Sequence, residues 1–155
     1  MNNKLLSLGH GYSAHALERL LSLDDWEIFA TTRGSEKSSV INNHKVSAFI
    51  WPGTDLVSQI ENATHILLSI PPNKNGDPVF LEYGNVIASS KNLKWVGYLS
   101  TTGVYGYHSG GWVDENTPLK PTTERGNKRV LAERQWLELA KESALPLNIF
   151  RLAGI

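Results

Sequence analysis

Two glycines near the start of the chain have the spacing of a phosphate-binding loop. Gly9, Gly11 and Ala14 fit the pattern G-x-G-x-x-A and follow a short apolar run. In such a loop the first glycine allows a tight turn, the second lets the backbone approach a pyrophosphate, and the following helix offers free N–H groups. The pattern predicts a dinucleotide site, with a purely structural turn as the alternative. The cofactor-binding residues predicted in this loop are Gly9, His10, Gly11, Tyr12 and Ser13.

The end of the second predicted strand bears on which dinucleotide is bound. NAD-selective sites carry an acidic residue about twenty residues after the glycines, where it binds the ribose 2′-hydroxyl. This chain has Thr32 and Arg33 there instead. A carboxylate would repel a 2′-phosphate, whereas a guanidinium and a hydroxyl bind one. We therefore expect NADP, with NAD less favoured, and the alternative is that Arg33 is simply an exposed residue at a strand end.

A third segment is expected to reach the same ligand. Ser69, Ile70 and Pro71 end a largely apolar run, at the edge where a parallel sheet places its cofactor. We expect backbone contacts to the dinucleotide there, although termination of the strand alone explains the prolines.

Alternating strand and helix patterns must position these residues. The first helical pattern places Ala14, Leu17, Leu20 and Leu21 on one face. Six strands joined by crossovers predict an α/β fold with a doubly wound parallel sheet, in one domain over residues 1–155. The predicted strands are 5–8, 26–31, 46–51, 65–70, 95–100 and 147–152, and the later predicted helices are 56–63, 79–89 and 127–143.

Composition excludes several functional classes. The 155 residues include 15 Lys plus Arg, 15 Asp plus Glu and no cysteine. Zero formal charge argues against a nucleic-acid-binding face or a membrane anchor, and the lack of cysteine excludes disulfides and thiolate metal sites. The histidines show no zinc-ligand spacing, so no metal is expected. With no targeting or membrane-spanning segment, a cytoplasmic protein is the expectation.

Several motifs together resemble the NAD-dependent epimerase/dehydratase family of extended and atypical short-chain dehydrogenase/reductases, and most closely its YeeZ-like subgroup. The resemblance covers nearly the whole chain and implies an NAD(P)-binding Rossmann fold and hydride-transfer chemistry on a small molecule such as a sugar nucleotide. The motifs are GHGYSA at 9–14, STTGVYG at 100–106, DENTPLKP at 114–121, RVLAE at 129–133 and IFRLAG at 149–154.

The catalytic pattern departs from the family. Thr101 matches the family's Ser/Thr, but Arg125 and Arg129 stand where the Tyr and Lys of Y-x-x-x-K belong. An arginine does not exchange a proton near neutral pH, so Arg125 cannot replace the tyrosine, whereas Arg129 can still bind the nicotinamide ribose. Tyr105 is the best substitute acid/base, although lining the pocket is the favoured role for its family equivalent. The candidate catalytic residues are Thr101, Tyr105 and Arg129, and Thr101 and Arg129 are also expected to bind the cofactor.

Members of the family continue into a substrate-binding lobe that this sequence lacks. The resemblance therefore implies that the chain is a fragment or a shortened gene product, or that a second copy or another partner chain completes an uncovered sheet edge. Two functions therefore stay open: an NADP-dependent oxidoreductase or nucleotide-sugar epimerase/dehydratase, and a non-catalytic NADP(H)-binding module or regulator.

Overall fold

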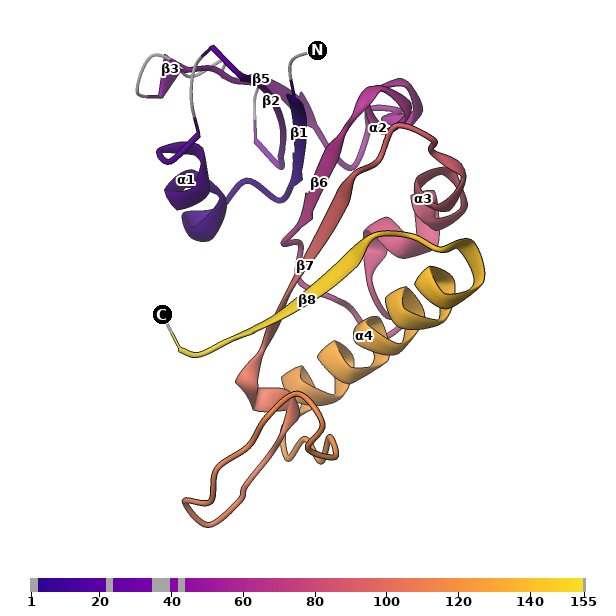
Figure 1. Ribbon diagram of the computed structural model, residues 1–155. Helices are drawn as coiled ribbons and strands as arrows, with labels where there is room; N and C mark the ends of the chain where they lie inside the picture. The colour runs from indigo at the N-terminus through magenta and orange to yellow at the C-terminus, as the bar shows by residue number, and fades with distance from the viewer. Residues whose placement is uncertain (1–2, 22–23, 35–39, 42–43, 155) are drawn as a thin grey trace.

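A six-stranded parallel sheet forms the centre of the computed structural model, which describes residues 3–21, 24–34, 40–41 and 44–154 (Figure 1). The strands lie side by side in the order β5-β2-β1-β6-β7-β8. Counted along the chain this is 3-2-1-4-5-6, the order of a doubly wound dinucleotide-binding sheet, which reverses between β1 and β6. The predicted fold class is confirmed. The strands are β1 (Asn3–Leu8), β2 (Trp26–Thr32), β5 (Ser47–Ile50), β6 (His65–Leu68), β7 (Trp95–Thr101) and β8 (Leu147–Leu152).

Helices cover both faces of the sheet. On one face α1 (Tyr12–Glu18) packs through Ala14 on Leu5 and Leu67. On the other face α2 (Val57–Asn62), α3 (Pro78–Ser89) and α4 (Glu124–Ser143) enclose the larger apolar cluster, which contains Leu6 and Leu68 (Figure 1). Successive strand residues thus face opposite layers, as the period of two requires. Among the described residues, no helix has the length and apolar character needed to cross a lipid bilayer.

Side-chain caps define where the two long helices begin. The Asp77 carboxylate accepts hydrogen bonds from the N–H groups of Val79 (2.7 Å) and Phe80 (3.0 Å) at the start of α3. Thr123 Oγ1 accepts one from the N–H of Gly126 (3.0 Å). This cap explains why α4 begins at Glu124, three residues before the predicted start at 127.

Three local features differ from the sequence expectations. Along the chain, an antiparallel pair of short strands, β3 (Val40–Ile41) and β4 (His44–Lys45), comes after β2 and before β5. A 3₁₀ turn, η1 (Thr102–Val104), follows β7. The placement of Leu20 on the buried face of the first helix was wrong, because α1 ends at Glu18 and Leu20 is 83% exposed.

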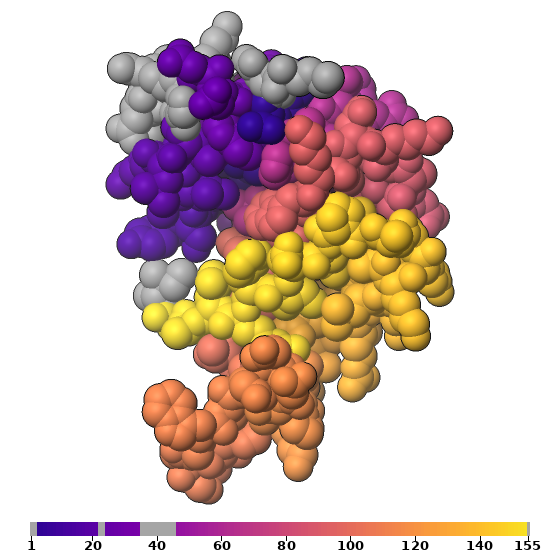
Figure 2. Space-filling model, in the orientation of Figure 1, coloured from indigo at the N-terminus to yellow at the C-terminus, as the bar shows by residue number. Residues whose placement is uncertain are grey.

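The connection from η1 to α4 projects from the body of the molecule. Figure 2 shows this segment, residues 105–123, as a mainly orange protrusion at the bottom of the molecule. It begins at the carboxyl end of β7, the edge at which the glycine loop also lies.

Candidate functional site

The glycine loop leaves β1 in a conformation that only its first glycine makes accessible. Gly9 has φ +88°, a region that side chains disfavour, and a Cβ built there would lie 2.8 Å from Ile70 Cγ1. Gly11 has φ −100°, and a Cβ built there would meet no atom within 4 Å. The fold therefore requires Gly9, whereas Gly11 leaves room for a group lying against the loop.

Hydrogen bonds from three strand ends hold this loop. The N–H of Gly9 donates to Thr31 Oγ1 (2.8 Å), and the N–H of His10 donates to the carbonyl of Thr31 (3.3 Å). The Ser69 hydroxyl donates to the carbonyl oxygens of Gly9 and of Leu8, the latter at 3.3 Å. The carboxyl ends of β1, β2 and β6 are thereby joined around Gly9. No side chain caps the start of α1, so its first N–H groups face the loop region without a side-chain acceptor.

Two cavities meet at the glycine loop, one on each side. The β2-side cavity has a volume of about 660 Å³, and the β7-side cavity has one of about 430 Å³. Gly9, Gly11 and Ser69 line both of them. The two cavities therefore flank one glycine-rich turn at the strand-order reversal, where open α/β sheets bind ligands.

The structure brings all the predicted cofactor-binding residues to these two cavities. Both arginines of the altered Y-x-x-x-K pattern, Arg125 and Arg129, also line the β7-side cavity. The β7-side cavity is lined by Tyr12, Ser13, Thr101 and Arg129, the β2-side cavity is lined by His10, Thr32, Arg33, Ile70 and Pro71, and both are lined by Gly9, Gly11 and Ser69.

Arg129 is a fixed cation in the wall of the β7-side cavity. Its side chain reaches from α4 to β7, where Nη1 donates to the carbonyl of Leu99 (2.6 Å) and to the hydroxyl of Tyr98 (3.1 Å). Burial raises the pKa of Tyr98 to about 12, although the nearby guanidinium acts in the opposite direction. Tyr98 therefore stays protonated and accepts a hydrogen bond from Arg129. Thr101 Oγ1, at the end of β7, accepts one from the N–H of Gly103 (3.1 Å).

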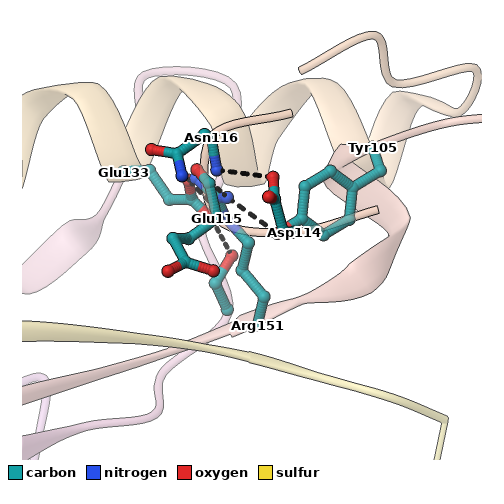
Figure 3. A network of polar contacts seen from close by, with 7 residues as sticks. Tyr105, Asp114, Glu115, Asn116, Glu133 and Arg151 are labelled. Atoms are coloured by element: carbon teal, nitrogen blue, oxygen red, sulfur yellow. Dashed lines mark hydrogen bonds and ion pairs between the residues drawn. The ribbon is translucent and has the colours of Figure 1, made fainter. Parts of the chain in front are cut away.

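Tyr105 lies outside the β7-side cavity. It lines a separate hollow of about 530 Å³ with Asp114, Glu115 and Arg151. Its hydroxyl accepts a hydrogen bond from Arg151 Nη1 at 2.9 Å, and the guanidinium also stacks over its ring (Figure 3). The structure therefore does not bring Tyr105 together with Thr101 and Arg129 around one cavity.

Sequence reasoning missed the buried network that holds Tyr105 in place. The Glu133 carboxylate is fully buried; it accepts hydrogen bonds from Ser100 Oγ (2.5 Å) and from two nitrogens of Arg151 (Figure 3). The hydrogen bond to Glu133 is the main reason that the pKa of Arg151 is raised. One signal was present in the sequence: Glu133 falls on the same helical stripe as the buried residues Gly126, Val130 and Trp136.

Solved structures of other proteins share this fold. A conserved protein of unknown function from Silicibacter pomeroyi is 45% identical, with a TM-score of 0.87 over 99% of this chain and 54% of its own. A UDP-glucuronic acid 4-epimerase from Bacillus cereus in complex with NAD is 17% identical, with a TM-score of 0.73 over 97% of this chain and 56% of its own. Vestitone reductase from alfalfa is 16% identical, with a TM-score of 0.79 over 97% of this chain and 56% of its own.

The chain spans about half the length of each of these three proteins. The epimerase and the reductase have low identity to it, so the likeness to them concerns the fold. No protein-family model matches the chain, and no curated protein matches it.

Proposed function

We propose that this chain binds a nicotinamide dinucleotide across its two cavities, as the cofactor domain of a hydride-transferring protein of the NAD-dependent epimerase/dehydratase type. The observation that carries the proposal is the meeting of the two cavities at Gly9, Gly11 and Ser69. A dinucleotide consists of two nucleosides joined by a diphosphate, so its site needs two hollows with an anion-accepting turn between them. The open space beside Gly11 is where the diphosphate would lie.

The residues of the β2-side cavity support a preference for NADP. Thr32 and Arg33 line this cavity, and no Asp or Glu is among the described residues that do so. A guanidinium and a hydroxyl fit a ribose 2′-phosphate, which a carboxylate would repel. The epimerase complex from Bacillus cereus holds NAD, so this preference rests on the residues of this chain alone.

In the β7-side cavity the chain's own residues would bind and orient. A bound nicotinamide supplies a carbon that accepts or donates hydride. Arg129, held by Leu99 and Tyr98, would offer a fixed positive charge to the nicotinamide ribose, and the Thr101 hydroxyl, which lines the same cavity, would orient a carbonyl or alcohol. A small alcohol or carbonyl compound, such as a sugar nucleotide, is the substrate class proposed. We also propose membership of the YeeZ-like subgroup, which rests on the resemblance of the sequence motifs taken together.

One observation favours a second function, that of a non-catalytic module that binds NADP(H). Arg125 and Arg129 line the β7-side cavity where the resembling family carries its Tyr and Lys. An arginine side chain is a poor general acid or base, so it does not supply the chemistry of a tyrosine. The phenol that lines this cavity belongs to Tyr12, which is 77% exposed, whereas Tyr105 is bound to Arg151 in another hollow.

Calorimetric titration of the chain with NADPH and, separately, with NADH tests dinucleotide binding. Gly11→Val should fold normally, because its Cβ has open space, but should abolish binding by filling that space. Gly34→Val is the matched control, since a Cβ at Gly34 also meets no atom within 4 Å and Gly34 lines neither cavity. The proposal would be refuted if neither nucleotide gave heat of binding, or if Gly11→Val bound the nucleotide as tightly as the unmodified chain.

Turnover separates the two functions. The full chain is mixed with NADPH or NADP and with a panel of sugar nucleotides and small carbonyl compounds, and the reduced nicotinamide is followed by its absorbance. Oxidation or reduction of the cofactor supports the enzyme. Tight binding of NADPH without turnover by any member of the panel supports the module.

A further inference from the structure

Three potential metal ligands converge behind the glycine loop. His10 lies in the loop, and His15 and Glu18 lie one turn apart on α1. Glu18 Oε2 is 3.0 Å from His10 Nε2 and 3.5 Å from His15 Nδ1. One ligand atom from each of the three side chains lies within 4.8 Å of the other two, and the two imidazole rings meet edge to face at 4.3 Å between centroids.

The burial of Glu18 leaves its charge incompletely matched. The carboxylate is fully buried, and Oε1 has no hydrogen-bond partner among the described residues. A buried carboxylate requires a cation or several donors to offset its desolvation. His10 Nδ1 is likewise buried without a hydrogen-bond partner among the described residues.

The spacing of the donor atoms fits a small divalent cation. Metal–ligand distances of 2.0–2.2 Å in a tetrahedral site place neighbouring ligand atoms about 3.4 Å apart. The two separations from Glu18 Oε2, 3.0 Å to His10 Nε2 and 3.5 Å to His15 Nδ1, lie on either side of that value. Two imidazole nitrogens and one carboxylate select zinc and its neighbours over magnesium or calcium, which prefer oxygen ligands.

We propose that His10, His15 and Glu18 form a binding site for a divalent cation of the zinc class, in which a water molecule takes the fourth ligand position. The side chain of His15 is 36% exposed, so the site is accessible from solvent. The cation would neutralise Glu18 and link the glycine loop to α1. The three ligands meet without any bound dinucleotide, so this site is independent of the proposed function.

The test uses metal alone and no nucleotide. The full chain, treated with a chelator and dialysed, is titrated with zinc sulfate by calorimetry, and with Co²⁺ while its visible absorption is recorded. We expect one zinc ion to bind per chain, and the bound Co²⁺ to show the visible absorption typical of a four-coordinate ion. His15→Gln should weaken zinc binding at least about tenfold, because even outer-shell changes cost about 10–100-fold in affinity.

Matched variants keep the result decisive. His15 is partly exposed, so His15→Gln should retain the fold, which circular dichroism verifies; Glu18→Gln is the second ligand variant. His108→Gln is the control, because His108 is also partly buried but its Nε2 contacts the carbonyl of Tyr105 and no carboxylate. Lack of one-to-one zinc binding by the unmodified chain, or equal weakening by His108→Gln and His15→Gln, would overturn the proposal.

Discussion

Nη2 of Arg151 lies 2.9 Å from Oε2 of Glu133, and this ion pair joins β8 to the buried face of α4. Ser100 on β7 donates a hydrogen bond to Glu133, and Arg151 donates one to the hydroxyl of Tyr105, the residue that follows η1. One network thus links β7, the residue after η1, α4 and β8 around the buried carboxylate of Glu133, close to the cavity-lining residue Thr101.

Arg151→Met should destabilise the fold more than Glu133→Gln. The arginine variant leaves a fully buried carboxylate without its cation, which costs about 3–5 kcal/mol. The glutamine variant leaves Arg151, whose side chain is 17% exposed and can be hydrated. Urea unfolding of the two variants and the unmodified chain measures the difference. If Arg151→Met were as stable as the unmodified chain, the ion pair would have no role in stability.

Alkaline pH should weaken the fold through Tyr98. Its pKa is raised from 10 in the unfolded chain to about 12 in the fold. Between these values the folded state binds more protons than the unfolded state, so the free energy of unfolding falls as the pH rises. Tyr98→Phe removes this titration, and its free energy of unfolding should depend less on pH from 10 to 12. Identical slopes for the two proteins would contradict the raised pKa.

The Asp77 cap should matter for its hydrogen bonds and not for its charge. Asp77→Ala leaves the N–H groups of Val79 and Phe80 without their acceptor and should cost about 1–2 kcal/mol. Asp77→Asn keeps an acceptor oxygen and should cost much less.

The pH dependence of Asp77→Asn has a definite sign. Burial raises the pKa of Asp77, with the N–H of Phe80 acting in the opposite direction. Ionisation of Asp77 thus weakens the fold, and the stability contributed by its protonated form is lost as the pH rises through the folded pKa. The stability of Asp77→Asn relative to the unmodified chain should therefore increase from acid to neutral pH. Thermal unfolding at a series of pH values measures this difference.

The substitution Arg33→Ala should weaken the binding of NADPH and not that of NADH. If Arg33 binds the 2′-phosphate as proposed, its removal should lower the affinity for NADPH about tenfold and leave that for NADH unchanged. Arg134→Ala, at an exposed position on α4 outside both cavities, is the control. Tighter binding of NADH than of NADPH by the unmodified chain would end the NADP preference.

Tyr105→Phe should change stability and not cofactor affinity. The variant loses the hydrogen bond from Arg151 to the phenol, and the hydroxyl lies outside the β7-side cavity. We expect a loss of about 1–2 kcal/mol in the free energy of unfolding and unchanged binding of NADPH. If a substrate is found and Tyr105→Phe abolishes its turnover at full NADPH affinity, the acid/base role expected from sequence would be supported instead.

The fold was predictable because its signals are local and repeated. Apolar runs such as 65–70 mark buried parallel strands, and crossover helices allow few sheet orders. The glycine loop was also recognisable, since Gly9 requires a positive φ that the pattern anticipates. The short β3–β4 pair escaped notice because two-residue strands carry no periodicity.

The charged interior was harder to predict, because a sequence pattern does not say which carboxylates find partners. Glu18 and Glu133 occupy buried helix positions, yet each is stabilised by residues distant along the chain or in the preceding loop. The location of Tyr105 likewise depends on Arg151, 46 residues later. Such contacts arise from tertiary packing, and residue type and local spacing do not specify them.

The tethering of Gly9 to Thr31 and Ser69 has a consequence for recognition. A loop that is already ordered loses little conformational entropy when it is occupied, so more of the contact energy is expressed as affinity. Association of a ligand with this loop should then proceed without a slow rearrangement of the loop, at a rate set by diffusion and orientation.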